Sequence, residues 1–234
     1  MVDTENLNTS KQTFLSACRT HNLTITNPQL ELLEKYVSLL LSHNKYLNLI
    51  SRKDEQNIWT QHILHCMSLL FHRKFPPNVN ILDLGTGGGL PGIVFAILHP
   101  ELQFTLLDAT RKKIDAVRSM AGELGLKNVS TVRGRAEEIG KHPDYSRKFD
   151  IVVARAVGSL ENLVKWAIPF LRSETTKAED TPGLIPRQSL VAFKGGDIDE
   201  ELSHARKTGL FRSGEVIDIA GGEEKKIVIM SLFA

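Results

Sequence analysis

The sequence has few of the features that mark secreted, membrane or metal-binding proteins. Its 234 residues include two cysteines, Cys18 and Cys66, which lie too far apart for a disulfide framework or a Cys-x-x-Cys metal site. No apolar run approaches the roughly 18 residues of a membrane span. The N-terminus also lacks the basic start and apolar stretch of an export signal. We therefore expect a cytoplasmic protein with no membrane partner and no metal.

A large excess of charge of one sign is also missing. Lysine and arginine number 29 and aspartate and glutamate 27, which leaves a formal net charge of +2. A nucleic-acid ligand would therefore have to be held by a local basic patch and not by the field of the whole molecule. The length allows one large α/β unit with a smaller appendage, and the composition names no function.

The N-terminal third predicts helices. Asn27 reads as an N-cap followed by Pro28 in the first turn, and apolar residues at helical spacing continue to about Ser42. A second helix is expected to open near Asp54, whose carboxylate can cap free amides, and to end before Pro76. These segments predict that the chain begins with a helical module.

A shorter helix over residues 13–20 completes this module, which we place at residues 1–75, and a second domain covers residues 76–234. From residue 80 onward, short apolar strands alternate with helices, which is typical of a mainly parallel sheet. The predicted parallel strands cover residues 80–86, 104–109, 129–134, 149–156 and 189–195.

The last two predicted strands, residues 215–220 and 226–233, are joined by a turn too short for a crossover, so they must be antiparallel. The predicted fold class is α/β, with a Rossmann-like, mostly parallel sheet that ends in an antiparallel hairpin. By analogy this is the outline of a class I AdoMet-dependent methyltransferase, whereas a dehydrogenase keeps its strands parallel. Residues 173–187 are polar and aperiodic, and we expect a mobile insertion there without chemistry.

The segment richest in glycine, residues 83–92 (DLGTGGGLPG), leaves a buried strand and enters a helix. It also fits the dinucleotide pattern G-x-G-x-x-G, which is weak support for a nicotinamide or flavin. Asp83 beside the turn suits a ligand with a cationic ammonium and sulfonium, and Pro91 removes an amide that a phosphate would use. Both points favour AdoMet, and the remaining alternative is a turn that binds nothing.

Two further segments carry candidate ligand contacts. Asp108 ends the second strand about 20 residues after the glycine turn, where a carboxylate can accept bonds from ribose hydroxyls. Its alternative role is a helix N-cap. Residues 134–138 (GRAEE) could bring the Ala136 amide and the Glu137 carboxylate to an adenine, or could form a solvated helix start.

These motifs, in this order, resemble the glucose-inhibited division protein B family, the RsmG-type guanine-N7 methyltransferases of small-subunit ribosomal RNA. The resemblance covers nearly the whole chain, including NKYLNLIS at 44–51, VVARAVGSLENLVKWAIPFL at 152–171 and FKGG at 193–196. It implies a cytoplasmic enzyme that uses S-adenosyl-L-methionine. Its partner would be small-subunit ribosomal RNA or the assembling small subunit, and we expect a monomer.

The resemblance also assigns residues. The expected cofactor positions are Asp83, Gly85, Gly87, Leu90, Asp108, Ala109, Thr110, Ala136, Glu137 and Arg155. The residues expected to face RNA are Arg133, Arg135 and Lys194, and the candidates for positioning the target base are Arg155, Lys194 and His62. Because a cation on guanine N7 would block attack there, Arg155 or Lys194 is expected to contact O6 or a phosphate.

One position departs from the family pattern. The family commonly continues I-L-D-S after the histidine, whereas here Ile63-Leu64 is followed by His65 and Cys66. The acidic residue is missing, so the role of that carboxylate is in doubt for this chain. His62, His65 and Cys66 share a helix face, but no carboxylate or second cysteine completes a metal site.

The expected chemistry needs few residues. Guanine N7 carries a lone pair and no proton, so its methylation requires positioning and no general base. A cytosine-C5 enzyme would need a nucleophilic cysteine preceded by proline, which neither cysteine provides. Two alternatives from other classes stay open: a nicotinamide-dependent oxidoreductase, and a non-catalytic RNA binder in ribosome assembly.

Overall fold

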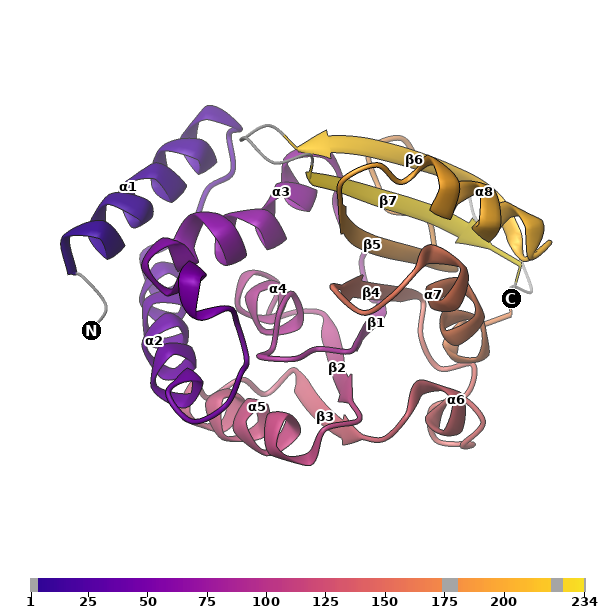
Figure 1. Cartoon of the computed structure of the whole chain (residues 1–234), viewed down its shortest axis with the longest axis horizontal. Coiled ribbons are helices and arrows are strands. Elements are labelled where there is room, and N and C mark those ends of the chain that lie inside the picture. The colour runs from indigo at the N-terminus through magenta and orange to yellow at the C-terminus, as the bar shows by residue number, and fades with distance from the viewer. Residues whose placement is uncertain (1–3, 174–180, 220–224, 234) are drawn as a thin grey trace.

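In the computed structural model, which describes residues 4–173, 181–219 and 225–233, helices cover both faces of one sheet (Figure 1). The sheet has seven strands in the order β3-β2-β1-β4-β5-β7-β6. Their bounds are β1 Asn80–Leu84, β2 Gln103–Asp108, β3 Val129–Arg133, β4 Ile151–Arg155, β5 Ser189–Gly195, β6 Phe211–Ile219 and β7 Lys225–Leu232.

The strand directions confirm the predicted fold class. Strands β1 to β5 pair in parallel, with β1 between β2 and β4. Strand β7 lies between β5 and β6 and is antiparallel to both. The expected antiparallel hairpin is therefore present, and β7 inserted beside β5 is the feature that a dehydrogenase order of strands lacks.

The N-terminal helices differ in detail from the prediction. Helix α1 spans Thr4–Thr20 and is longer than expected, and α2 spans Asn27–Asn44. The N-cap of α2 is Thr26 and not Asn27, because the Thr26 hydroxyl accepts from the Gln29 amide while the Gln29 side chain accepts from the Thr26 amide. This reciprocal pair is a capping box.

The expected second helix is three consecutive elements of different pitch. A 3₁₀ helix η1 (Arg52–Asn57) is followed by a π-helix η2 (Trp59–Leu64) and then by α3 (His65–His72). The prediction that Asp54 caps it was wrong, since the N-cap is Ser51, whose hydroxyl accepts from the Lys53 amide. The π-helix has no signature in the hydrophobic spacing, so periodicity could not distinguish it from an α-helix.

Two layers of side chains bury the two faces of the sheet. Strand residues alternate between them: Ile151 and Val153 pack toward α1–α5, while Val152 and Ala154 pack toward α6–α8. In Figure 1 these two groups of helices lie on opposite sides of the sheet. The remaining helices are α4 Gly92–Leu98, α5 Arg111–Glu123, α6 Ala136–Ile139, α7 Leu160–Ala167 with η3 Ile168–Phe170, and α8 Asp199–Lys207.

The predicted insertion at 173–187 is only partly described, because residues 174–180 lie outside the described ranges, as does most of the predicted GGEEK turn. The described part, residues 181–187, is anchored to the rest of the protein by burial, a hydrogen bond and an ion pair. Ile185 is fully buried and its amide donates to the Lys74 carbonyl, while Arg187 pairs with the buried Asp150 carboxylate. Within the described ranges, no helix has the length and apolar character that crossing a membrane requires.

The capping box gives a test of the corrected helix start. Thr26→Ala should lower the free energy of unfolding by about 1 kcal/mol, because it leaves the Gln29 amide in the first turn of α2 without its acceptor. Asn27→Ala is the matched control and should have a clearly smaller effect. Urea unfolding of both variants would measure the difference, and an equal or larger loss in the Asn27 variant would contradict the assignment.

Candidate active site

A cavity of about 410 Å³ opens at the carboxyl ends of β1, β2 and β4. This is the switch point of the sheet, where the chain turns in opposite directions from neighbouring strands and where open α/β folds bind ligands. Every predicted cofactor residue except Asp83 lines the cavity: Gly85, Gly87, Leu90, Asp108, Ala109, Thr110, Ala136, Glu137 and Arg155. Arg135 also lines it, whereas Arg133, Lys194 and His62 do not.

The glycine turn between β1 and α4 forms the floor of the cavity. The amides of Gly85 and Thr86 both donate to the Leu107 carbonyl, which ties the turn to the end of β2. Gly85 has φ +74°, and a Cβ there would lie 2.5 Å from a methyl of Val157. Only glycine fits this position without moving the loop that follows β4.

Asp83 lies behind the turn and not in the cavity. Its side chain is fully buried, and its Oδ2 accepts from the Thr86 hydroxyl at 2.7 Å and from the Gly92 amide at 2.9 Å. Burial raises the pKa of Asp83 to about 6, against the lowering effect of these hydrogen bonds. Because the Gly92 amide at the start of α4 is already bonded, that amide is not available to a phosphate.

Asp108 faces the cavity from the end of β2. Its Oδ2 accepts from the Gly87 amide at 3.1 Å and its Oδ1 from the Thr110 amide at 2.8 Å. The N-cap of α5 is Thr110, so Asp108 is not the helix cap that the alternative interpretation required. Each carboxylate oxygen can accept a further hydrogen bond, which leaves Asp108 able to bind hydroxyl groups of a ligand.

Arg155, the last residue of β4, joins the cavity to the N-terminal helices. Its Nη2 lies 2.9 Å from Nδ1 of His62, a residue that is 8% exposed. Burial first, and then the positive charge of Arg155, lower the pKa of His62 to about 3. The imidazole is therefore neutral, and its Nδ1 accepts the hydrogen bond from the guanidinium.

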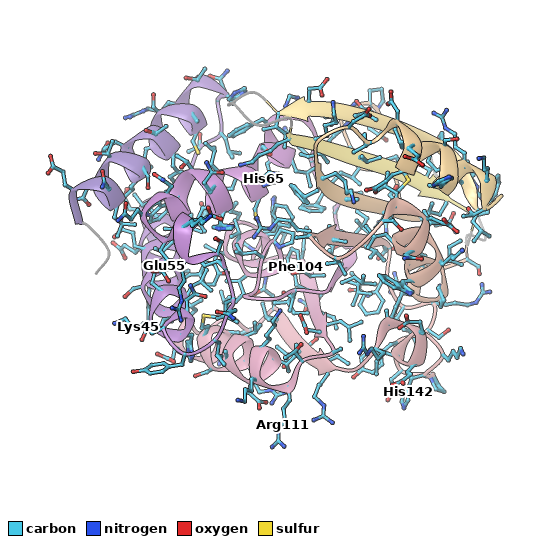
Figure 2. All side chains as sticks on the ribbon, in the orientation of Figure 1. Lys45, Glu55, His65, Phe104, Arg111 and His142 are labelled. Atoms are coloured by element: carbon cyan, nitrogen blue, oxygen red, sulfur yellow. The ribbon has the colours of Figure 1, made fainter. Side chains whose placement is uncertain are left out.

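The two residues that replace the family Asp-Ser pair are uncharged. Burial and Arg155 lower the pKa of His65 to about 3, and its ring meets the edge of Phe193 at a centroid distance of 5.4 Å. Figure 2 shows His65 between the N-terminal helices and the sheet. Burial raises the pKa of the Cys66 thiol to about 12. Within the described ranges, no group of three or more His, Cys, Asp or Glu side chains is arranged to hold a metal ion.

Lys194 is engaged within the protein. Its ammonium donates to the Gly158 carbonyl at 2.8 Å and pairs with Glu201 at 2.8 Å, and its side chain is 14% exposed. Glu201 in turn accepts from the Leu160 amide, so Lys194 and Glu201 tie the loop after β4 to α8. The roles of Lys194, Arg133 and Arg135 toward RNA stay predictions; Arg133 and Arg135 are exposed.

Several lining residues were not predicted from the sequence, among them Leu49, Lys113, Val157 and Trp166. Leu49 lies in residues 44–51, which carried the resemblance, but its apolar side chain gave no chemical signal. The Asn44 carboxamide fixes this segment by accepting from the Leu49 and Ile50 amides. Trp166 reaches the cavity from α7, a contact that only the packing of the helix determines.

Comparison with known proteins agrees with this geometry. A family model described as GidB, rRNA small subunit methyltransferase G, matches residues 29–228. The chain is 37% identical to the ribosomal RNA small subunit methyltransferase G of Chlorobaculum tepidum, over 91% of this chain and 94% of that protein. It is 31% identical to the protein of the same name from Moorella thermoacetica, over 88% and 77%.

The fold has neighbours among solved structures. Fibrillarin of Aeropyrum pernix, in complex with S-adenosyl-L-methionine, superimposes with a TM-score of 0.52 over 70% of this chain and 72% of its own. The two sequences are 13% identical. At that identity the likeness shows the fold alone, and it agrees with the class predicted from the order of strands.

The buried carboxyl of Asp83 predicts a dependence of stability on pH. In the unfolded chain this group releases its proton near pH 3.8, whereas the folded protein holds it to about pH 6. The folded state therefore binds more protons across this window, and stability falls as the pH rises through it. Asp83→Asn removes this slope while keeping an oxygen for Thr86 and Gly92.

The free energy of unfolding of the variant relative to the original protein should therefore rise between pH 4 and 6, by up to about 3 kcal/mol, and level off above. Urea unfolding at several pH values would measure it, with Glu200→Gln, an exposed carboxylate on α8, as the control. A pH-independent difference between Asp83→Asn and the original protein would show that Asp83 is ionised throughout.

Proposed function

The chain belongs to the rRNA small subunit methyltransferase G family, and we propose that it transfers a methyl group from AdoMet to N7 of a guanine in small-subunit ribosomal RNA. One observation carries the choice of cofactor. The cavity joins a glycine turn to the Asp108 carboxylate, while the Gly92 amide at the start of α4 is bonded by Asp83. The bonded amide disfavours the pyrophosphate of a dinucleotide, and the Asp108 carboxylate suits the ribose of a nucleoside. The preference for a cationic ligand that the sequence assigned to Asp83 has no support in the cavity, because Asp83 lies behind the turn.

The lining residues supply partners for the ribose, the methionine carboxylate and the adenine of AdoMet. Asp108 would accept hydrogen bonds from the ribose hydroxyls, as carboxylates at the end of the second strand do in nucleotide-binding folds. Arg155 would pair with the carboxylate of the methionine moiety. The Ala136 amide and Glu137, at the start of α6, would face the adenine.

Methyl transfer to guanine N7 requires that the two reactants be positioned, and it requires no general base. Bound AdoMet would supply an electrophilic methyl group, and guanine N7 offers a lone pair without a proton to remove. Asp108 and Glu137 are the carboxylates among the lining residues, and both are assigned to the cofactor. The residues of the chain therefore act by orienting the two reactants and excluding water.

The proposed partner is small-subunit ribosomal RNA or the assembling small subunit, which the enzyme would meet as a monomer in the cytoplasm. Arg133 and Arg135 are exposed where β3 leads into α6, and Arg135 lines the cavity. These cations would hold phosphates, which gives affinity that falls as salt rises. Figure 2 shows Arg111 projecting outward at the start of α5, beside the same edge of the sheet.

Methyl transfer to under-modified RNA tests the proposal directly. Small subunits from cells that lack the gene are incubated with the protein and methyl-labelled AdoMet, and the RNA is digested to nucleosides. Label should appear as N7-methylguanosine at one site. Label in another nucleoside would overturn the N7 assignment. Absence of label, with NAD binding in calorimetry, would favour an oxidoreductase; RNA binding without AdoMet binding would favour an assembly factor.

Removal of the proposed ribose acceptor should weaken cofactor binding. Asp108→Ala is expected to reduce AdoMet affinity by roughly 1.5 to 3 kcal/mol, because hydrogen bonds to a charged acceptor are lost. Calorimetric titration would measure this, with Asp115→Ala on the exposed side of α5 as the control. Unchanged affinity in the Asp108 variant would remove the residue from the site.

A further inference from the structure

The hydrogen bond between Arg155 and His62 connects the N-terminal helices to a charged side chain of the cavity lining. We propose that His62 is a positioning residue that holds the Arg155 guanidinium at the cavity wall, in place for the anionic end of AdoMet. The inference rests on the proposed function, because it concerns how one of its cofactor contacts is fixed. His62 lies outside the cavity lining, so it acts through Arg155.

The backbone around His62 is built to aim its side chain. His62 lies in η2, the π-helix Trp59–Leu64. Such wide turns are rare, and they are frequently found at functional sites. Buried side chains hold the same turn in place. Trp59 and Ile63 are buried, and the centroid of the Trp59 ring lies 5.1 Å from that of Phe14 on α1. His62 is therefore held on a rigid segment.

The hydrogen bond also fixes the state of the imidazole. The guanidinium can only donate, so Nδ1 of His62 must be unprotonated and its proton must lie on Nε2. That nitrogen is 3.3 Å from the carboxylate of Asp54, an electrostatic contact that favours the Nε2–H tautomer without meeting hydrogen-bond geometry. Asp54, on η1, thus stabilises the tautomer in which His62 can accept from Arg155 on β4.

A neutral partner leaves the charge of Arg155 free to act. Within the described ranges Arg155 forms no ion pair with a carboxylate, and His65 occupies the position where the family commonly has aspartate. A carboxylate would both hold the guanidinium and cancel much of its charge. The His62 imidazole accepts one of the five N–H bonds without adding negative charge, so the guanidinium keeps its attraction for an anion.

The test separates an acceptor role from a packing role by two substitutions. His62→Asn keeps an oxygen near the position of Nδ1 but leaves a void, whereas His62→Phe fills the space but offers no acceptor. We expect the Phe variant to be the more stable one in thermal unfolding. We also expect it to bind AdoMet about tenfold more weakly than the original protein, with the Asn variant recovering most of the affinity.

If the Phe variant is the more stable of the two but binds AdoMet more weakly, the positioning role of His62 is supported. If the more stable variant is also the one that binds AdoMet more tightly, that role is overturned. A double-mutant cycle adds a second criterion. In an Arg155→Met background, His62→Phe should cause no further loss of AdoMet affinity, because the residue through which it acts is gone. An undiminished further loss would show that His62 acts by another route.

A measurement on the cofactor-free protein keeps this inference separate from the proposed function. Nitrogen NMR of ¹⁵N-histidine-labelled protein, with the signal assigned by its loss in His62→Asn, should show a neutral Nε2–H tautomer at pH 6. A protonated ring or the Nδ1–H tautomer would overturn the Arg155 contact. If the original protein fails to bind AdoMet, the proposed function and this inference both fail. If the original protein binds AdoMet, but the AdoMet affinities of the two His62 variants follow the order of their thermal stabilities, only this inference fails.

Discussion

The two hydrogen bonds that Asp83 accepts from Thr86 and Gly92 are the constraint on which the site depends. They fold the glycine turn back onto the end of β1, and they do so from inside the core, where no water can substitute. A Cβ on Gly92 would lie 2.6 Å from the Asp83 carboxylate, so the glycine there is required by its partner. The turn thus has its binding conformation before a ligand binds. The entropy lost in ordering it is lost during folding and does not weaken binding.

The site draws on both the sheet and the N-terminal helices. Parallel strands bring the ends of β1, β2 and β4 to one edge, which collects the glycine turn, Asp108 and Arg155. The N-terminal part of the chain then closes the cavity: Leu49, in the loop after α2, lines it, and the Tyr36 hydroxyl on α2 donates to the Gly88 carbonyl. The N-terminal helices share one buried layer with β1 and β4. A change in the packing of the helices therefore also affects the position of the glycine turn.

The absence of the family aspartate at position 65 changes the electrostatics of this region without emptying it. His65 fills the space as a neutral ring against Phe193, and the buried Cys66 thiol beside it is also uncharged. Arg155 then depends on His62 for its only hydrogen bond to a side chain among the residues that the structure describes.

The sequence by itself determined the fold class, the parallel strands with their terminal antiparallel hairpin, and most of the segments that meet at the cavity. Helical spacing, the glycine turn and the lengths of loops are local properties, so they can be recognised without knowing which distant residues are in contact. Tertiary structure alone decided that Asp83 lies behind the turn, that Lys194 is bonded to Gly158 and Glu201, and that residues 59–64 form a π-helix. Those outcomes depend on contacts with residues far away in the sequence. A local sequence pattern does not tell how close such residues lie or how deeply they are buried.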